Sequence, residues 1–110
     1  MAHSNYQHTI LIIQFDKRIV SRTWIDTPSV NDAVEELVQL YEDQVRAQCK
    51  NMQPGDQITY TFGELERFIN NMDTACCLIM DAATKTYIPR DKDWLKLRVR
   101  IIDLDDGLLE

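Results

Sequence analysis

The sequence predicts an α+β fold in which a four-stranded antiparallel sheet carries helices on one face. Two pairs of short segments, three of them rich in β-branched or aromatic residues and one an apolar run of strand length, indicate two hairpins. Apolar residues at helical spacing fill much of the chain between and after them. With 110 residues the chain is long enough for one domain with its own core. We place that domain at residues 8–102, between a flexible N-terminal tail (1–7) and an acidic C-terminal tail (103–110).

Residues 8–15 form the first predicted strand, and both faces of this strand are apolar in the middle. Side chains alternate along a strand, so one face carries His8, Ile10, Ile12 and Gln14 and the other carries Thr9, Leu11, Ile13 and Phe15. The chain has helices enough to cover only one of the two. A second copy of the same sheet is the simplest cover for the other face. The alternative is a two-layer domain with one tolerably exposed apolar side.

A hairpin partner at residues 22–26 and two capped helices follow. Ser29, with Asp32 three residues later, resembles a capping box before a long amphipathic helix. Thr61 and Glu64 form a better capping box, and the helix that they begin is predicted to end near Asp73. Residues 58–60 are β-like but too short for a strand to be assigned.

The second predicted hairpin pairs residues 75–80 with residues 85–88, and Pro89 is expected to end its second strand. The last segment gives conflicting signals. Residues 95–101 alternate with the period of a strand, whereas Asp91 is a suitable helix cap and Asp93 is an acidic residue suited to the first turn. We predict a helix here.

The composition indicates an intracellular protein without a membrane span, a metal or a cofactor. No apolar run approaches the roughly 18 residues that a spanning helix needs, and the N-terminal residues lack a secretory signal pattern. Cys49, Cys76 and Cys77 are odd in number and lack metal-binding spacing, which is typical of free thiols in a reducing compartment. The net charge of −6 argues against wholesale binding of nucleic-acid phosphates.

A direct RNA-binding function is the alternative that the sequence leaves open. It would use a basic region with aromatic residues among the cations, suited to single-stranded RNA: Lys85, Tyr87, Arg90, Lys92, Trp94, Lys96, Arg98 and Arg100. The simpler interpretation is a solvated helix face with Trp94 in the core. Catalysis has little support, because no nucleophile lies beside a base and there is no glycine-rich phosphate loop.

Two positions match the preference of acidophilic kinases for an acid three residues downstream. Thr23 precedes Asp26 by three residues, and Ser29 precedes Asp32 by three. For Ser29 a capping role is the simpler account. A phosphate on Thr23 would add nearly two negative charges to a sheet residue, and we expect it to loosen the sheet or the dimer.

Taken together, these segments resemble the enhancer of rudimentary homologue family. The resemblance covers roughly residues 8–97. It rests on the order and spacing of many small pieces: His8-Thr9-Ile10-Leu11, Gln14, Lys17-Arg18, Arg22-Thr23-Trp24, Ser29-Val30-Asn31, Tyr41-Glu42, Ile58-Thr59-Tyr60, Phe68-Ile69, Cys77-Leu78, Thr86-Tyr87, Pro89 and Lys92-Asp93-Trp94. No single piece is diagnostic, but the joint pattern is specific.

The resemblance implies a four-stranded antiparallel sheet with three helices on one face, and a homodimer through the open sheet face. Ile10 and Ile12 would lie at that interface, with His8, Gln14 and Trp24 near it. It also implies that the last segment is a helix beginning near Lys92.

The function implied is that of a small nuclear adapter without catalysis. Such an adapter binds short segments of RNA-processing proteins in splicing, RNA decay, small-RNA maturation and cell-cycle control. The expected location is the nucleus, with cytoplasmic RNA granules as the alternative or additional location. Arg90 stands where the family usually has tyrosine, and the acidic residues after 102 replace a tail that is more often basic or glutamine-rich. The chain is therefore expected to be a diverged member.

Overall fold

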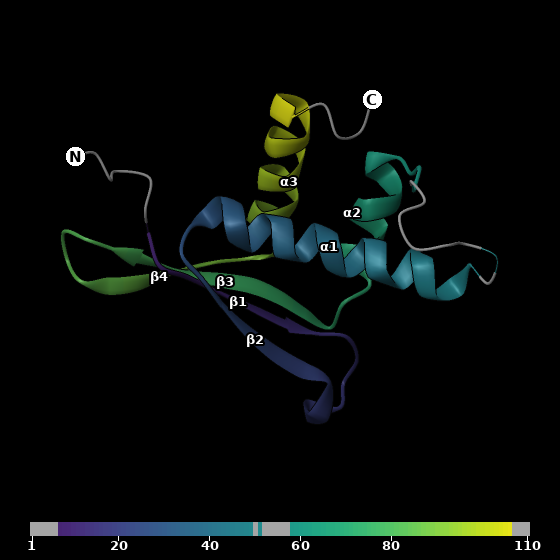
Figure 1. Cartoon of the computed structure of the whole chain (residues 1–110). Helices are drawn as coiled ribbons and strands as arrows, with labels where there is room; N and C mark the ends of the chain where they lie inside the picture. Colours follow the sequence, from purple (N-terminus) through teal and green to yellow (C-terminus); the bar gives the residue numbers. More distant parts are fainter. Residues whose placement is uncertain (1–6, 50, 52–57, 107–110) are drawn as a thin grey trace.

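The computed structural model describes residues 7–49, 51 and 58–106 (Figure 1). The predicted N-terminal tail, apart from residue 7, and the last four residues of the predicted C-terminal tail lie outside the described residues. The elements in chain order are β1 (Thr9–Gln14), a 3₁₀ turn (Ile19–Ser21), β2 (Arg22–Thr27), α1 (Val30–Gln48), α2 (Phe62–Asn70), β3 (Thr74–Asp81), β4 (Thr86–Arg90) and α3 (Lys92–Asp106).

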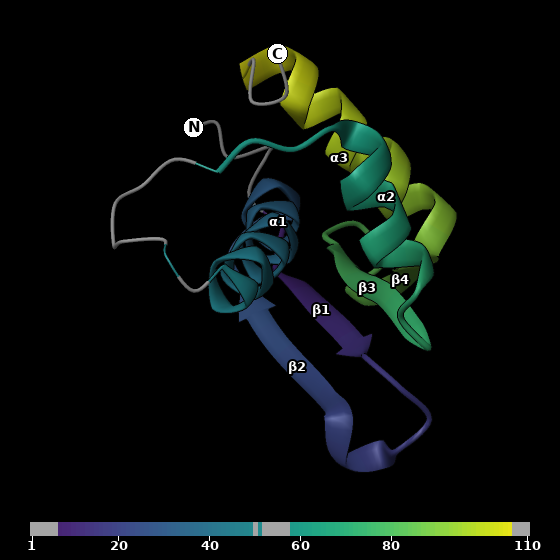
Figure 2. The same cartoon turned by 90° about the vertical axis from the view of Figure 1, so that its right-hand side faces the viewer.

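The four strands form one antiparallel sheet in the order β2-β1-β3-β4. The two hairpins therefore meet along β1 and β3, at the centre of the sheet. Figures 1 and 2 show α1, α2 and α3 on the same side of this sheet; none of the helices in the described part of the chain lies on the opposite side. The predicted α+β architecture, with three helices on one face of a four-stranded antiparallel sheet, is confirmed.

Pro89 lies inside β4, so the prediction that it ends this strand is wrong. The N–H of Met80 bonds the carbonyl of His8 on the β1 side, so its neighbour Ile79 directs its backbone groups toward β4. Ile79 pairs with Ile88, and Pro89, the next residue, therefore faces the outer edge. Because β4 is an edge strand, the missing N–H of proline interrupts no hydrogen bond of the sheet there.

Both predicted N-caps are present. The Ser29 hydroxyl accepts a hydrogen bond from the Asp32 N–H at 3.1 Å. At the start of α2, Thr61 and Glu64 form the full reciprocal capping box. Each cap satisfies helical N–H groups that have no partner within the helix.

The ambiguous last segment is a helix, as predicted. Asp91 Oδ1 accepts from the Trp94 N–H at 3.0 Å and caps its first turn. Leu95 and Val99, four residues apart, are fully buried, whereas Leu97 is 55% exposed. Burial therefore follows the helical period rather than the alternating one. The helix continues to Asp106, four residues into the segment that we assigned to the acidic tail.

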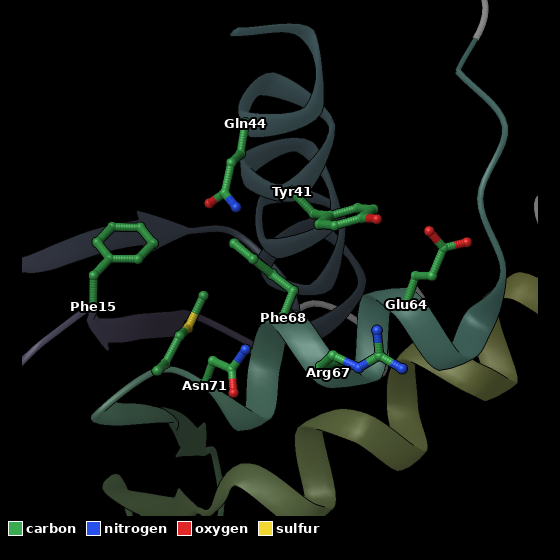
Figure 3. A pocket seen from close by; sticks show the side chains of 8 residues that line it. Phe15, Tyr41, Gln44, Glu64, Arg67, Phe68 and Asn71 are labelled. Carbon is green, nitrogen blue, oxygen red and sulfur yellow. The ribbon is translucent and has the colours of Figure 1, made fainter. Parts of the chain in front are cut away.

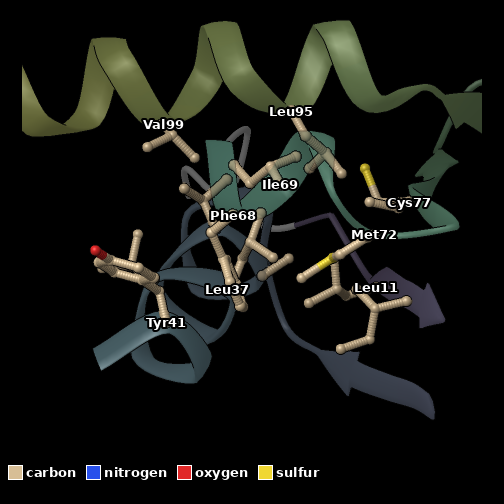
Figure 4. Close-up of a cluster of buried hydrophobic side chains, with 14 of the residues drawn as sticks. Leu11, Leu37, Tyr41, Phe68, Ile69, Met72, Cys77, Leu95 and Val99 are labelled. Atoms are coloured by element: carbon tan, nitrogen blue, oxygen red, sulfur yellow. The ribbon is translucent and has the colours of Figure 1, made fainter. Parts of the chain in front are cut away.

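The core lies between the sheet and the helices (Figure 4). Leu11 and Ile13 project into it from β1, and Leu37, Leu65 and Leu95 contribute one leucine from each helix; all five are fully buried. Burial of such side chains is the main stabilising contribution to a domain of this size. Among the described residues, no helix is both long and apolar enough to cross a membrane.

Candidate interaction surfaces

The face of the sheet that carries no helices, which we call the open face, presents apolar side chains from all four strands. Leu11, Ile13 and Cys77 are buried beneath the helices, and side chains alternate along a strand, so the residues between them point the other way. The apolar side chains of the open face come from all four strands: Ile10, Ile12, Trp24, Cys76, Leu78, Met80, Tyr87 and Pro89.

The open face is continuous across the strands. Ile12 lies between Trp24 on β2 and Cys76 on β3. The Trp24 side chain is 61% exposed, although tryptophan is usually well covered in a folded domain. Ile12 itself is only 9% exposed, because its neighbours on the same face cover it. An apolar patch of this kind marks an interaction surface.

A chain of polar contacts crosses the open face beside Ile10. The Nδ1 atom of His8 lies 2.6 Å from the Tyr87 hydroxyl, and its Nε2 atom lies 3.4 Å from Asp26 Oδ1. The His8 and Tyr87 rings also meet edge to face, with their centroids 5.8 Å apart. His8 therefore links the two outer strands and fixes the orientation of Tyr87.

The other end of the open face is polar. Gln14 is almost fully buried, and its Nε2 donates to the Asp16 carbonyl at 2.7 Å while its Oε1 accepts from Arg22 Nε at 2.9 Å. The five residues predicted near a dimer interface thus lie on one side of the sheet, with the isoleucines at its centre. Their contact with a second copy stays a prediction.

A pocket with an aromatic wall opens between α1, α2 and the end of β1 (Figure 3). Its volume is about 370 Å³. Phe15, Phe68 and Tyr41 line it in a row, with ring centroids 6.4 and 5.1 Å apart. Burial raises the pKa of the Tyr41 phenol, and the Glu64 carboxylate raises it further. Tyr41 is therefore a neutral phenol in this pocket.

A second depression, which we call the Trp94 groove, lies between the start of α1, strands β3 and β4, and α3. Its volume is about 420 Å³. It is lined by Gln7, Ser29, Val30, Asn31, Ile79, Ile88, Arg90, Trp94 and Arg98. The guanidinium carbons of Arg90 and Arg98 lie 5.8 and 5.6 Å from the centroid of the Trp94 ring. No acidic side chain is among its lining residues.

The residues proposed for RNA contact do not form one continuous surface. Arg90 and Arg98 line the Trp94 groove. The Lys92 ammonium donates to the Met72 carbonyl at 2.6 Å, and Lys96 donates to Asn70 Oδ1 at 2.8 Å, so both turn toward α2. Arg100 lies over the Phe62 ring at 4.5 Å. The cations are thus divided between two sides of α3.

The two residues proposed for phosphorylation differ in their surroundings. Thr23 is exposed on β2 and pairs with Ile13, so its side chain lies on the helical side of the sheet, opposite to Trp24. The Ser29 hydroxyl donates to Asp32 Oδ2 at 2.9 Å in addition to capping α1. A phosphate on Ser29 would replace this cap beside the Trp94 groove. Both sites stay predictions.

The described residues offer little chemistry for catalysis. They contain no group of three or more His, Cys, Asp or Glu side chains placed to hold a metal ion. Burial raises the pKa of the Cys76 thiol. The pKa of the Cys77 thiol is raised to about 11, mainly by burial and to a smaller extent by electrostatic repulsion from Cys76. Both thiols are therefore protonated near neutral pH and are poor nucleophiles.

Sequence reasoning missed part of the open face, and of the Trp94 groove it singled out for binding only Arg90, Trp94 and Arg98, without the residues of α1 and β3 that complete it. Leu78, Met80 and Tyr87 belong to the open face. They could have been assigned to it from the sequence, because side chains alternate between the two faces along the predicted strands 75–80 and 85–88. The groove has no such signal, because it joins residues from four separate parts of the chain.

The chain resembles known proteins over most of its length. The profile of the Enhancer of rudimentary family matches residues 5–102. The protein enhancer of rudimentary of Drosophila virilis is 34% identical over 95 residues, which cover 86% of this chain and 88% of that protein. The enhancer of rudimentary homolog of Echinococcus multilocularis is 37% identical over 90 residues, covering 81% and 85% of the two chains.

A third relative gives the same result. The enhancer of rudimentary homolog of Dictyostelium discoideum is 32% identical over 92 residues, covering 84% of this chain and 89% of that protein. The likeness therefore spans the whole sheet and its helices rather than one motif. The chain belongs to the Enhancer of rudimentary family.

Proposed function

We propose that this protein is a homodimeric adapter that binds short segments of RNA-processing proteins and helps to assemble their complexes. The observation that carries the proposal is the open face, an apolar surface that extends across all four strands with Trp24 61% exposed. Packing the open faces of two molecules together would remove both apolar surfaces from water and form an interface with two-fold symmetry. Ile10 and Ile12 would lie at its centre.

The adapter part of the proposal follows from membership of the family and from the shape of the protein. The Trp94 groove and the aromatic pocket lie on the helical side of the sheet, so a dimer through the open faces leaves both accessible. Each dimer then offers two equivalent copies of each site. Two weak contacts with one disordered partner segment, or with two linked segments, would act together through their high effective concentration.

We propose that the protein acts in the nucleus, with cytoplasmic RNA granules as a second location, and that it has no catalytic activity. The Enhancer of rudimentary family is not known as an enzyme family. The pathway, whether splicing, RNA decay or small-RNA maturation, is set by the partner. Direct RNA binding receives less support, because the basic residues of 85–100 are divided between two sides of α3.

The dimer is tested by replacing an apolar side chain at the centre of the open face with a charged one. Ile10 is half-buried in the isolated chain. In a dimer of the Ile10→Arg variant, the substituted side chains of the two subunits would bring two positive charges together in the interface. Sedimentation equilibrium should give twice 12.9 kDa for the wild type and 12.9 kDa for the variant. Two like charges brought together in an interface cost several kcal/mol, enough to separate the subunits at micromolar concentration even though Asp26 lies opposite Ile10 on β2.

Leu97→Arg is the matched control, because Leu97 is an exposed apolar residue on α3, on the other side of the protein. It should remain dimeric. A monomeric wild type would overturn the dimer. The adapter role is tested separately by mass spectrometry of proteins captured by the wild type and by Ile10→Arg. The wild type should enrich RNA-processing factors, and their absence would contradict the adapter role even if the dimer is present.

A further inference from the structure

We propose that the Trp94 groove recognises an acidic partner segment, in which one or more Asp or Glu side chains flank an apolar residue. The inference rests on the proposed adapter function, which supplies the class of ligand, and adds the chemistry by which this site selects it. Three independent features of the groove point to a carboxylate.

The first feature is an excess of positive charge. Arg90 and Arg98 line the groove and no Asp or Glu does, although the whole chain has 18 acidic and 12 basic residues. Among the ion pairs of the described residues, neither arginine takes part. Their contacts with the Trp94 ring hold both guanidinium groups at the groove without neutralising them.

The second feature is an unsatisfied donor. The Nε atom of Arg98 is buried and, among the described residues, has no hydrogen-bond partner. The Nη2 atom of the same guanidinium reaches Asn31 Oδ1 only at 3.4 Å, a long hydrogen bond. A buried donor of this kind is expected to have an acceptor. Because Nε is buried, a carboxylate would reach it only after a rotation of the Arg98 side chain away from Asn31; the planar fork of arginine would then fit the carboxylate through two parallel hydrogen bonds.

The third feature is the N-terminus of α1, a helix of 19 residues, whose residues Ser29, Val30 and Asn31 line the groove. The first N–H groups of a helix have no acceptor within it, and the positive end of its dipole favours anions. Ser29 satisfies the N–H of Asp32, which leaves the earlier N–H groups of this turn to other acceptors. The charges of the arginines and the helix dipole therefore act in the same direction, and the Asp32 carboxylate, which accepts from the Ser29 hydroxyl at 2.9 Å, offsets them only in part.

The rest of the groove is suited to a protein segment rather than to RNA. Val30, Ile79 and Ile88 provide an apolar wall for the residue beside the carboxylate. Two guanidinium groups already lie against the Trp94 ring, so a nucleobase would have to displace them in order to stack there. Arg90 stands where the resemblance predicts a tyrosine, so this preference for acid is expected to be a property of the present chain.

The proposal is tested by selecting phage-displayed random peptides on the wild-type dimer and on Arg90→Gln/Arg98→Gln. Peptides selected on the wild type should be enriched in Asp and Glu next to an apolar residue, and this enrichment should be lost on the double variant. The best wild-type peptide, labelled and followed by fluorescence anisotropy, should bind the double variant about tenfold to a hundredfold more weakly. Its affinity for the wild type should fall as salt is added.

Three further variants make the experiment specific. Lys17→Gln/Arg46→Gln removes two positive charges at residues outside the groove and should bind like the wild type. Arg90→Gln changes an exposed side chain, so it should fold even if replacement of Arg98 impairs folding, which circular dichroism would detect. Arg98→Lys keeps the charge but removes the buried Nε donor, and should show an intermediate loss of affinity.

The outcomes separate this inference from the adapter function. Selection of peptides without acidic enrichment, or enrichment that persists on the double variant, would overturn the charge preference and leave the adapter function intact. Selection of no peptide at all by the wild type would overturn both. Displacement of the selected peptide by oligouridine, with the same dependence on both arginines, would make the groove an RNA site and overturn the proposal for an acidic peptide.

Discussion

Cys76 and Cys77 are neighbours in the chain but lie on opposite faces of β3. Cys77 points into the core and is fully buried, whereas Cys76 belongs to the open face and is half-buried. Cys49, after the end of α1, is exposed. Because a strand sends successive side chains to opposite sides, these two adjacent thiols report on the core and on the open face separately.

Labelling with iodoacetamide at about pH 8, below the usual thiol pKa, should therefore distinguish three rates. Cys49 should react first. Cys77 should react only as fast as the protein unfolds, because its side chain is buried and its pKa is raised to about 11. Cys76 should be protected in the wild-type dimer and react faster in Ile10→Arg. Mass spectrometry of the digested protein gives each rate.

The fully denatured protein is the control for this experiment, since all three thiols should then react at similar rates. Rapid labelling of Cys77 in the native protein would contradict the burial described for β3. Equal labelling of Cys76 in the wild type and in Ile10→Arg would contradict a dimer that covers the open face.

At the level of single elements, the helices were predictable because their caps are local in the sequence. Ser29 and Thr61 mark the first residues of α1 and α2, and Asp91 marks that of α3, where the pattern of apolar residues alone favoured a strand. Pro89 was misjudged, because the effect of a proline on a strand depends on whether its nitrogen faces a neighbour. That is a property of the sheet order and cannot be obtained from residues 85–90 alone.

The cap of α2 gives a test at this scale. Thr61→Ala removes the hydroxyl that accepts from the Glu64 N–H, and should lower the free energy of unfolding by about 1 kcal/mol. The effect should be clear because α2 has only nine residues, and helices of this length depend on caps and packing. Urea unfolding followed by circular dichroism measures it.

Thr59→Ala is the matched control, since Thr59 is exposed and lies in no helix or strand. Its free energy of unfolding should stay within about 0.5 kcal/mol of the wild type. An equal loss in both variants would show that the capping box contributes nothing specific.

For the whole molecule, the alternation of residues 8–15 predicted that one face of the sheet would lack cover, and the structure places no helix there. The Trp94 groove was beyond prediction, because Val30, Ile88 and Arg98 are brought together only by the packing of α1 and α3 against the sheet. The spacing of residues along the chain does not predict which distant segments will pack against one another.

The open face also makes a prediction for the stability of the assembly. If folding and association are coupled, the melting temperature of the wild type should rise with protein concentration. Ile10→Arg should melt at a temperature independent of concentration, and Leu97→Arg should behave as the wild type does. Differential scanning calorimetry at several concentrations measures this, and a wild-type melting temperature that does not change would argue against a dimer.

The position of Pro89 makes one edge of the sheet unfavourable for the addition of further strands. A sheet with a free edge can add strands from further molecules and grow into a fibre. On the β4 edge the outward position of Pro89 has no N–H to offer an incoming strand, so addition there lacks one of its hydrogen bonds. If the proposed dimer forms, pairing through the open faces would bury the open face of both molecules, while Pro89 disfavours the addition of strands at the β4 edge; the other edge, β2, contains no proline.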